Sequence, residues 1–268
     1  MKRLSRFYVG LCMAFLYLPI LVLIVFSFNE SKSRAVFTGF SLKWYQALFS
    51  NNTILTALGN TLIIAVVSTV IATLIGVAAA IGINAMQKWL RGLVLNITYM
   101  PIVNPEIVTG VSLSLLFVFM REMAGLPIEM GFVTLILAHV TFSTPYVILN
   151  VLPKLRQMNK NIYNAAMDLG CSPMQAVLKV VLPEIMPGII SGAFMAFTFS
   201  IDDFVISYFV SGPTVQTLPI VIYAMTRKRV SPEINALSAI IFLVVIGVLF
   251  ISNIVQDKWD AEAKRRLS

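Results

Sequence analysis

Charged residues are scarce in this chain of 268 amino acids. Asp, Glu, Lys and Arg together make up 12% of it, whereas 58% is hydrophobic and the mean hydropathy is +0.87. A soluble domain carries about 25% charged residues, roughly twice this share. The deficit excludes an ordinary soluble globular protein and predicts a polytopic membrane protein, for which lipid is the main solvent.

Histidine and cysteine are also almost absent. Cys12 falls in an apolar segment and Cys171 in a polar one, so the sequence indicates neither a disulfide framework nor a zinc-type spacing. The single histidine, His139, has no nearby partner in sequence for a metal or a Ser-His-Asp site. Its position midway along an apolar segment favours a residue that hydrogen-bonds between helices over a proton carrier.

No nucleotide-binding loop is present in the sequence, which contains no Gly-Lys pair at all. Such a loop needs glycines so that backbone amides can surround the phosphates, and a lysine to reach the terminal ones. We therefore expect the chain not to be an enzyme, to hold no cofactor or metal of its own, and to depend on another subunit for any use of ATP.

Long apolar runs define the predicted fold, an all-α membrane protein forming one transmembrane domain over residues 1–268. A crossing helix needs about 20 mostly apolar residues. The first run is too long for a signal peptide and is read as an uncleaved helix. The third contains Pro101 and Pro105, which predict a kink or a bent entry segment. The six predicted spans are residues 7–28, 58–86, 93–120, 131–151, 188–211 and 236–255.

The distribution of basic residues predicts the orientation of these spans. With six spans both termini share one side, and that side carries 13 of the 20 Lys and Arg residues. The positive-inside rule then places both termini in the cytosol, together with the polar loop of residues 152–187. The net charge of +8 is thus explained by topology rather than by nucleic-acid binding.

The loop of residues 152–187 has the local chemistry of two short helices. Residues 161–169 can form the first, and Gly170 suits the left-handed residue that commonly ends a helix. Ser172 is a predicted N-cap, Pro173 follows at the first helical position, and Gln175 completes a capping box. A polar two-helix segment in the cytosol would be accessible to a soluble partner.

Three of the twelve acidic residues, Glu106, Asp202 and Asp203, fall within predicted spans, while no Lys or Arg lies in the interior of one. A charge inside a bilayer costs at least a few kcal/mol, so such residues are usually functional or paired. The presence of acidic but not basic residues inside the spans predicts a negatively charged path through the membrane, suited to a cationic substrate. Glu106 follows Pro105 and could instead cap a helix end. The adjacent aspartates would point about 100° apart on a helix, so we expect one of them to face the path.

Aromatic residues would complement these acids if the substrate were a polyamine. Its ammonium groups are separated by methylene runs, which suit carboxylates and ring faces together. Phe204, Tyr208 and Tyr223 are the candidates, although most aromatic residues of spans face lipid or the protein core.

Residues 164–183 resemble the coupling-loop signature of ABC importer permeases. Ala165, Ala166 and Gly170 occupy its first slots and Leu182-Pro183 its last, while Asn164 stands where the signature usually has Glu. The two alanines are expected to leave a smooth face for another protein. The resemblance implies that the loop docks into an ATPase subunit. The residues implied in this contact are Asn164, Ala165, Ala166, Asp168, Leu169 and Gly170.

Beyond the loop, the chain is similar to the spermidine/putrescine-type permease subunits of bacterial ABC importers. The matching stretches include Lys43-Trp44-Tyr45, residues 138–142, residues 199–203, Gly212-Pro213 and residues 231–237. The resemblance implies a type I importer permease in the bacterial inner membrane that forms half of a polyamine path. It also implies three kinds of partner: a second homologous permease, an extracytoplasmic polyamine-binding protein, and an ATPase dimer that binds ATP and Mg.

Two other functions remain open from the sequence. The same architecture could carry another cationic solute, such as ferric ion or thiamine. A proton-coupled secondary transporter could instead use Glu106, the aspartate pair and His139 as a relay, but it would leave the coupling loop unexplained.

Overall fold

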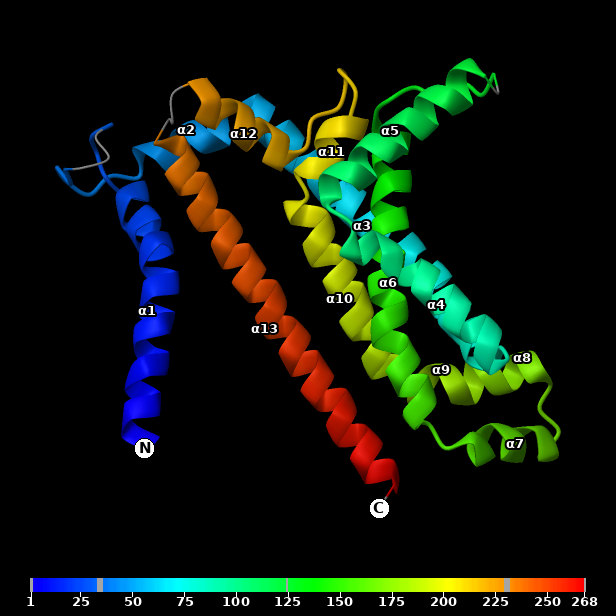
Figure 1. The fold of residues 1–268 in the computed structure, drawn as a ribbon. Coiled ribbons are helices and arrows are strands. Elements are labelled where there is room, and N and C mark those ends of the chain that lie inside the picture. Colours follow the sequence, from blue (N-terminus) through cyan, green and yellow to red (C-terminus); the bar gives the residue numbers. More distant parts are fainter. Residues whose placement is uncertain (1, 33–35, 124, 229–231, 268) are drawn as a thin grey trace. The chain divides into compact units, whose positions relative to one another are not determined.

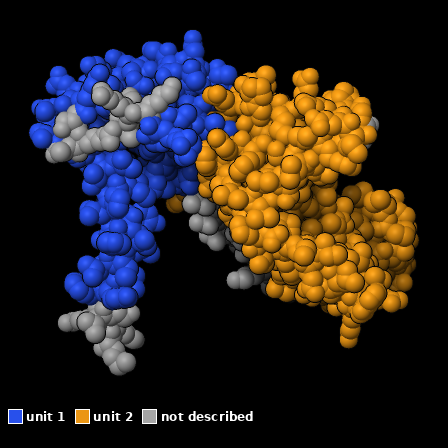
Figure 2. Space-filling view, turned by 45° about the horizontal axis from the view of Figure 1, so that its top comes forward, with its two compact units in different colours: residues 1–57, 220–248 blue, residues 58–219, 249–268 orange. Residues whose placement is uncertain are grey.

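The computed structural model describes residues 2–32, 36–123, 125–228 and 232–267. These fall into two compact units, shown in blue and orange in Figure 2. Unit 1 comprises residues 1–57 and 220–248, and unit 2 comprises residues 58–219 and 249–268. The described secondary structure is helical throughout, apart from an isolated bridge between Asn29 and Phe40.

Unit 1 contains the first helix and a small aromatic platform. Helix α1 (Lys2–Ser27) leads into a loop that packs on α2 (Lys43–Ser50). There the Trp44 indole N–H donates to the Asn29 carbonyl at 2.6 Å, and the Ser27 and Tyr45 hydroxyls lie 2.7 Å apart. The unit also holds most of α12 (Leu218–Lys228) and the first part of α13 (Glu233–Leu267). The segment Lys43-Trp44-Tyr45, one of the stretches similar to the permease family, therefore belongs to a packed cluster.

Unit 2 is built around α6 and α10, which lie side by side in Figure 1. Its core joins residues of α3, α6, a π-helical segment and α10, among them Ala80, Val147, Val181 and Ala196. The elements in chain order are α3 (Asn52–Ala85), α4 (Lys88–Val103), α5 (Glu106–Glu122), α6 (Phe132–Gln157), α7 (Lys160–Asp168), α8 (Pro173–Ala176), the π-helical η1 (Val177–Val181), α9 (Leu182–Glu184), α10 (Met186–Asp202) and α11 (Val205–Val210).

A ridge of small residues brings α10 against α6. Gly188, Gly192, Ala196 and Ser200 recur every four residues along one face of α10, and all four are buried. A Cβ atom added to Gly188 would lie 2.8 Å from the Asn150 carbonyl oxygen, and one on Gly192 would lie 3.0 Å from the α-carbon of Val147. Small residues at this spacing allow helix backbones to approach closely in membranes. The two backbones are thus nearly in contact.

Among the described residues, three helices are long and apolar enough to cross a membrane, or up to five when each bent pair is counted as one span. The three are residues 6–27, Asn52–Ala85 and Phe132–Gln157, which contain much of the first, second and fourth predicted spans. Two shorter apolar stretches, residues 218–227 and 233–247, follow later in the chain. Part of the sixth predicted span, residues 236–255, has side chains outside the described residues. Six spans in a single domain therefore stay a prediction.

Helix breaks interrupt the third and fifth predicted spans. Helices α4 and α5 meet at an angle of 104°, where Asn104 is extended before Pro105. Proline disfavours the helical conformation of the residue before it, so the predicted bend has the expected cause. The continuous span predicted over residues 188–211 is wrong, because α10 ends at Asp202 and Asp203 is extended. Both breaks place acidic residues at helix ends.

Candidate functional site

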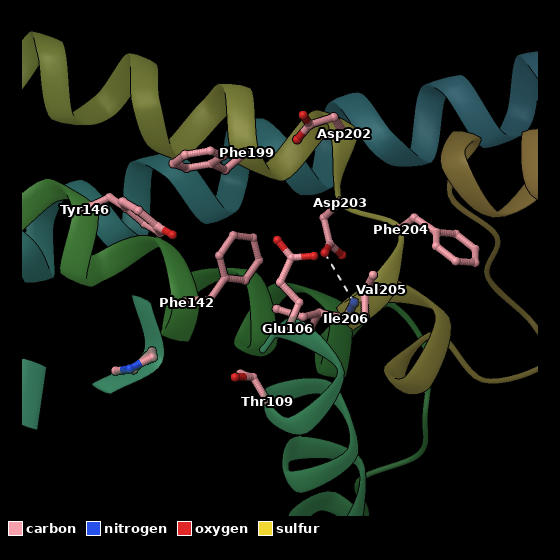
Figure 3. Close-up of a pocket in the computed structure, with 11 residues that line it drawn as sticks. Glu106, Thr109, Phe142, Tyr146, Phe199, Asp202, Asp203, Phe204, Val205 and Ile206 are labelled. Carbon is pink, nitrogen blue, oxygen red and sulfur yellow. Dashed lines mark hydrogen bonds between the residues drawn. The ribbon is translucent and has the colours of Figure 1, made fainter. Parts of the chain in front are cut away.

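A pocket of about 290 Å³ lies within unit 2 between the two helix breaks (Figure 3). All three acids of the predicted spans line it, together with aromatic residues from α6 and α10. The complete lining is Pro101, Glu106, Thr109, Phe142, Tyr146, Phe199, Asp202, Asp203, Phe204, Val205 and Ile206. The pocket therefore combines carboxylate side chains with the faces of aromatic rings.

The helix breaks explain how three acids from distant parts of the sequence come together. Glu106 is the first residue of α5, directly after the bend at Pro105. Asp202 is the last residue of α10, and Asp203 begins the extended turn that leads to α11. The expectation that only one aspartate faces the path assumed a continuous helix. Because the helix ends between the two residues, both line the pocket.

The Asp203 carboxylate has hydrogen-bond partners on α11. Its carboxylate accepts the backbone N–H of Ile206 at 3.2 Å and that of Ser207 at 2.7 Å, which caps the start of α11. Its Oδ2 also lies 3.6 Å from Nε2 of His139. The sequence contains no Lys or Arg that could pair with Asp203 inside a span, but this histidine stands beside it. Asp202 and Glu106 have exposed side chains.

His139 is the centre of a buried hydrogen-bond network behind the pocket. Its Nδ1 lies 2.6 Å from the Ser200 hydroxyl of α10, and its Nε2 lies 3.0 Å from the Ser207 hydroxyl of α11. Ser200 in turn lies 3.2 Å from the hydroxyl of Ser68 on α3. The predicted role of His139 as a residue that bonds between helices is confirmed.

The aromatic part of the pocket differs from the one that the sequence indicated. Of the three aromatic candidates, Phe204 lines the pocket; Tyr208 sits one turn further along α11, with its ring 5.5 Å from that of Phe204. Tyr223 belongs to unit 1, where Arg227 lies 5.5 Å from its ring centroid.

Three rings that sequence reasoning missed line the pocket instead. They are Phe142 and Tyr146 of α6 and Phe199 of α10, and the rings of Tyr146 and Phe199 lie 4.5 Å apart. For Phe142 and Tyr146 the sequence contained a signal, because these two residues and His139 follow the spacing of one helix face.

The coupling segment folds as its local chemistry predicts. Helix α7 ends at Asp168, and Gly170 has a φ of +86°. The Ser172 hydroxyl accepts the N–H of Gln175 at 3.3 Å, and the Gln175 side chain accepts the N–H of Ser172 at 3.0 Å. Pro173 begins the next helix. The predicted helix end, N-cap and capping box are therefore confirmed.

The exposed surface of this segment is not the expected alanine face. Ala166 is buried, so the prediction that both alanines form a smooth face is wrong; Ala165 is exposed together with Asn164 and Asp168. The most prominent apolar side chain is Leu169, which is 87% exposed at the end of α7. Leu169 and Ala165 are thus the exposed apolar residues at the end of α7, beside the polar Asn164 and Asp168.

Comparison with known proteins identifies the class. Residues 72–265 match the family described as the binding-protein-dependent transport system inner membrane component. This match covers well over half of the chain, and the chain belongs to that family. Membership agrees with the helical fold of the described residues.

Two curated relatives resemble the chain over most of its length. The putrescine transport system permease protein PotI of Escherichia coli (strain K12) is 42% identical over 88% of this chain and 84% of its own. The spermidine/putrescine transport system permease protein PotC of the same strain is 37% identical over 91% of each chain.

Solved structures share the fold at low sequence identity. One is a bacterial alginate ABC transporter in complex with an alginate pentasaccharide-bound periplasmic protein. It has a TM-score of 0.73, 18% identity, and coverage of 94% of both chains. Another is the MetNI methionine ABC transporter in inward-facing conformations, with a TM-score of 0.58, 19% identity, and coverage of 77% of this chain and 95% of the other. These likenesses establish the importer permease fold, and the substrate has to be argued from the site.

Proposed function

We propose that this chain is a permease subunit of an ABC importer and forms half of the membrane path for a polyamine such as putrescine or spermidine. The observation that carries the substrate class is the pocket in which Glu106, Asp202 and Asp203 meet four aromatic rings. Relatives that cover most of the chain are named for the transport of these same compounds.

The chemistry of the pocket matches an alkyl chain with ammonium ends. Carboxylates bind ammonium groups by charge-assisted hydrogen bonds, which are about twice as strong as neutral ones. Ring faces attract a cation and also cover methylene groups, each cation–ring contact contributing about 0.5–2 kcal/mol. The rings of Phe142, Tyr146 and Phe199 supply this surface next to the acids.

The remaining parts of the importer are assigned by the same proposal. The chain lies in the inner membrane of a bacterium with six spans and both termini in the cytosol. It pairs with a second permease, receives substrate from an extracytoplasmic binding protein, and docks on an ATPase dimer that holds ATP and Mg. The contact involves the exposed residues of the coupling segment, with Leu169 as its apolar centre.

Other functions agree less well with the site. Among the described residues no group of three or more His, Cys, Asp or Glu side chains is placed to hold a metal ion, which disfavours ferric ion as the solute. Thiamine lacks the two separated ammonium groups that two free carboxylates would bind. A proton-coupled secondary transporter could use His139 and Asp203, but it has no use for the coupling segment.

The deciding experiment is uptake into proteoliposomes that hold this chain with its partner permease, ATPase subunits and binding protein. We expect ATP-dependent accumulation of labelled putrescine or spermidine, and none of labelled thiamine or a phosphonate. Vesicles without ATP serve as the control. Transport of thiamine or a phosphonate but no polyamine would retain the importer architecture and refute the substrate.

Leu169 provides a test of the docking proposal. Changing Leu169→Asp places a charge where we expect an apolar contact with the ATPase, and burying an unpaired charge is costly. We expect substrate-stimulated ATP hydrolysis and uptake to fall together by roughly 30-fold, because the loss of a well-packed contact residue costs about 2 kcal/mol. Both rates are measured in the reconstituted complex.

The matched control for Leu169 is Leu126→Asp, which changes another exposed leucine in the loop between α5 and α6. This variant should retain stimulated hydrolysis. If Leu169→Asp also retains it while the complex stays assembled, the exposed leucine is not part of the contact.

A further inference from the structure

The three acids of the pocket differ in how much of their hydrogen-bonding capacity is already used. Asp203 accepts two backbone N–H groups and has His139 at 3.6 Å. Among the described residues, the Asp202 carboxylate bonds only to its own backbone N–H, and neither Asp202 nor Glu106 forms an ion pair. An ionised carboxylate only accepts hydrogen bonds, so partners already in place reduce what it offers to a ligand. The three acids therefore have two different roles.

The hydrogen-bond network assigns the proton positions on His139. Its Nε2 faces the Ser207 hydroxyl at 3.0 Å and the Asp203 carboxylate at 3.6 Å. The nearby carboxylate attracts an N–H dipole, so we assign the proton of the neutral imidazole to Nε2. Nδ1 is then an acceptor, and the Ser200 hydroxyl donates to it at 2.6 Å.

Every group in this chain of bonds is buried and comes from a different helix. Ser68 of α3, His139 of α6, Ser200 of α10 and Ser207 of α11 are each no more than 2% exposed. A buried network that is fully satisfied holds its members in one arrangement, because a lost partner leaves a polar group unpaired. The arrangement ends at Asp203, on the side that faces the pocket.

We propose that His139 is a positioning residue that holds Asp203 at the pocket wall through Ser207, and that Glu106 and Asp202 are the acids that bind the ammonium groups of the substrate. This inference rests on the proposed polyamine function for its ligand. Two available carboxylates match the two ammonium ends of a diamine. Asp203 contributes its charge and the shape of the break between α10 and α11.

The test is a double-mutant cycle on putrescine uptake by the reconstituted complex, with His139→Leu, Asp203→Asn and the combination. Each single variant is expected to raise KM by roughly tenfold with a much smaller change in maximal rate, as for the loss of one buried hydrogen-bonded partner. If His139 acts through Asp203, the combination raises KM no further than either change alone. If the KM increases of the two single variants instead multiply in the combination, the histidine acts independently of Asp203 and only supports the helices.

Two further variants keep the cycle interpretable. His139→Gln retains a donor and an acceptor and should keep KM within about threefold of the parent. Ser207→Ala removes the hydroxyl but leaves the backbone N–H that bonds to Asp203, so it weakens the connection without removing the histidine. Ser207→Ala replaces His139→Leu in the cycle if the leucine variant does not assemble.

A second measurement does not depend on transport. An apolar carbodiimide modifies protonated carboxyl groups, and mass spectrometry locates the product. Removing His139 should raise labelling of Asp203 by roughly tenfold without raising that of Asp202, because only Asp203 loses a neighbour that holds its carboxyl group against α11. Unchanged Asp203 labelling overturns the inference. An absence of polyamine uptake by the parent protein, with labelling as expected, refutes the substrate proposal instead.

Discussion

Neutralising Glu106 and Asp202 together is expected to abolish polyamine uptake. The variant Glu106→Gln, Asp202→Asn keeps the size of both side chains in the pocket and removes two of the three charges that line it. A hydrogen bond to a charged group contributes about 1.5–3 kcal/mol, so the loss of two should weaken binding by about 100-fold or more. The measurement is the initial rate of labelled putrescine uptake at several concentrations.

The matched control changes two acids outside the pocket. Glu122→Gln and Glu129→Gln remove the same charge from two exposed positions, the last residue of α5 and the loop before α6. Uptake by this control should equal that of the parent, and basal ATP hydrolysis should persist in both variants. Equal uptake by the pocket variant and the control would falsify the acidic path.

Replacing Gly188 is expected to prevent folding of unit 2. The Cβ atom of Gly188→Leu would lie 2.8 Å from the Asn150 carbonyl and 3.3 Å from the α-carbon of Val151. Both are backbone atoms of α6, so a change of rotamer cannot relieve the clash. Overpacking typically costs about 1–3 kcal/mol, and a clash with the backbone belongs at or above the upper end. We expect the yield of monodisperse protein in size-exclusion chromatography to fall by about tenfold.

A glycine with open surroundings provides the comparison. Gly82 of α3 is exposed and has no neighbour within 4 Å of an added Cβ atom. Gly82→Leu should leave yield and thermal stability close to those of the parent. If both leucine variants behave alike, the close approach of α10 to α6 is not what stabilises unit 2.

The sequence predicted those parts of the protein whose local chemistry is decisive. Ser172 and Gln175 cap the second helix of the coupling segment because the capping box is a contact between residues three apart. Gly170 ends the preceding helix because glycine adopts positive φ without a steric cost. The bend at Pro105 follows from the same kind of local rule. In each case the physical cause lies within a few residues.

What the sequence did not predict depends on contacts between distant segments. The break after Asp202 has no proline or glycine to signal it, and it is capped by Asp203 itself, so hydropathy continued the helix to residue 211. The burial of Ala166 likewise depends on which face of α7 packs on the unit. The small-residue ridge from Gly188 to Ser200 was visible in the sequence, and its spacing of four could have located the partner face of α10.

The ridge also has a mechanical consequence. From Gly188 to Ser200 the α10 axis rises about 18 Å, with the coupling segment before one end and the two aspartates after the other. Two backbones in near contact have no compressible layer of side chains between them. We therefore expect α6 and α10 to move together as one rigid pair. A tilt of about 10° applied at the coupling end displaces the far end by about 3 Å. That displacement is the length of a hydrogen bond, enough to engage or release an ammonium group.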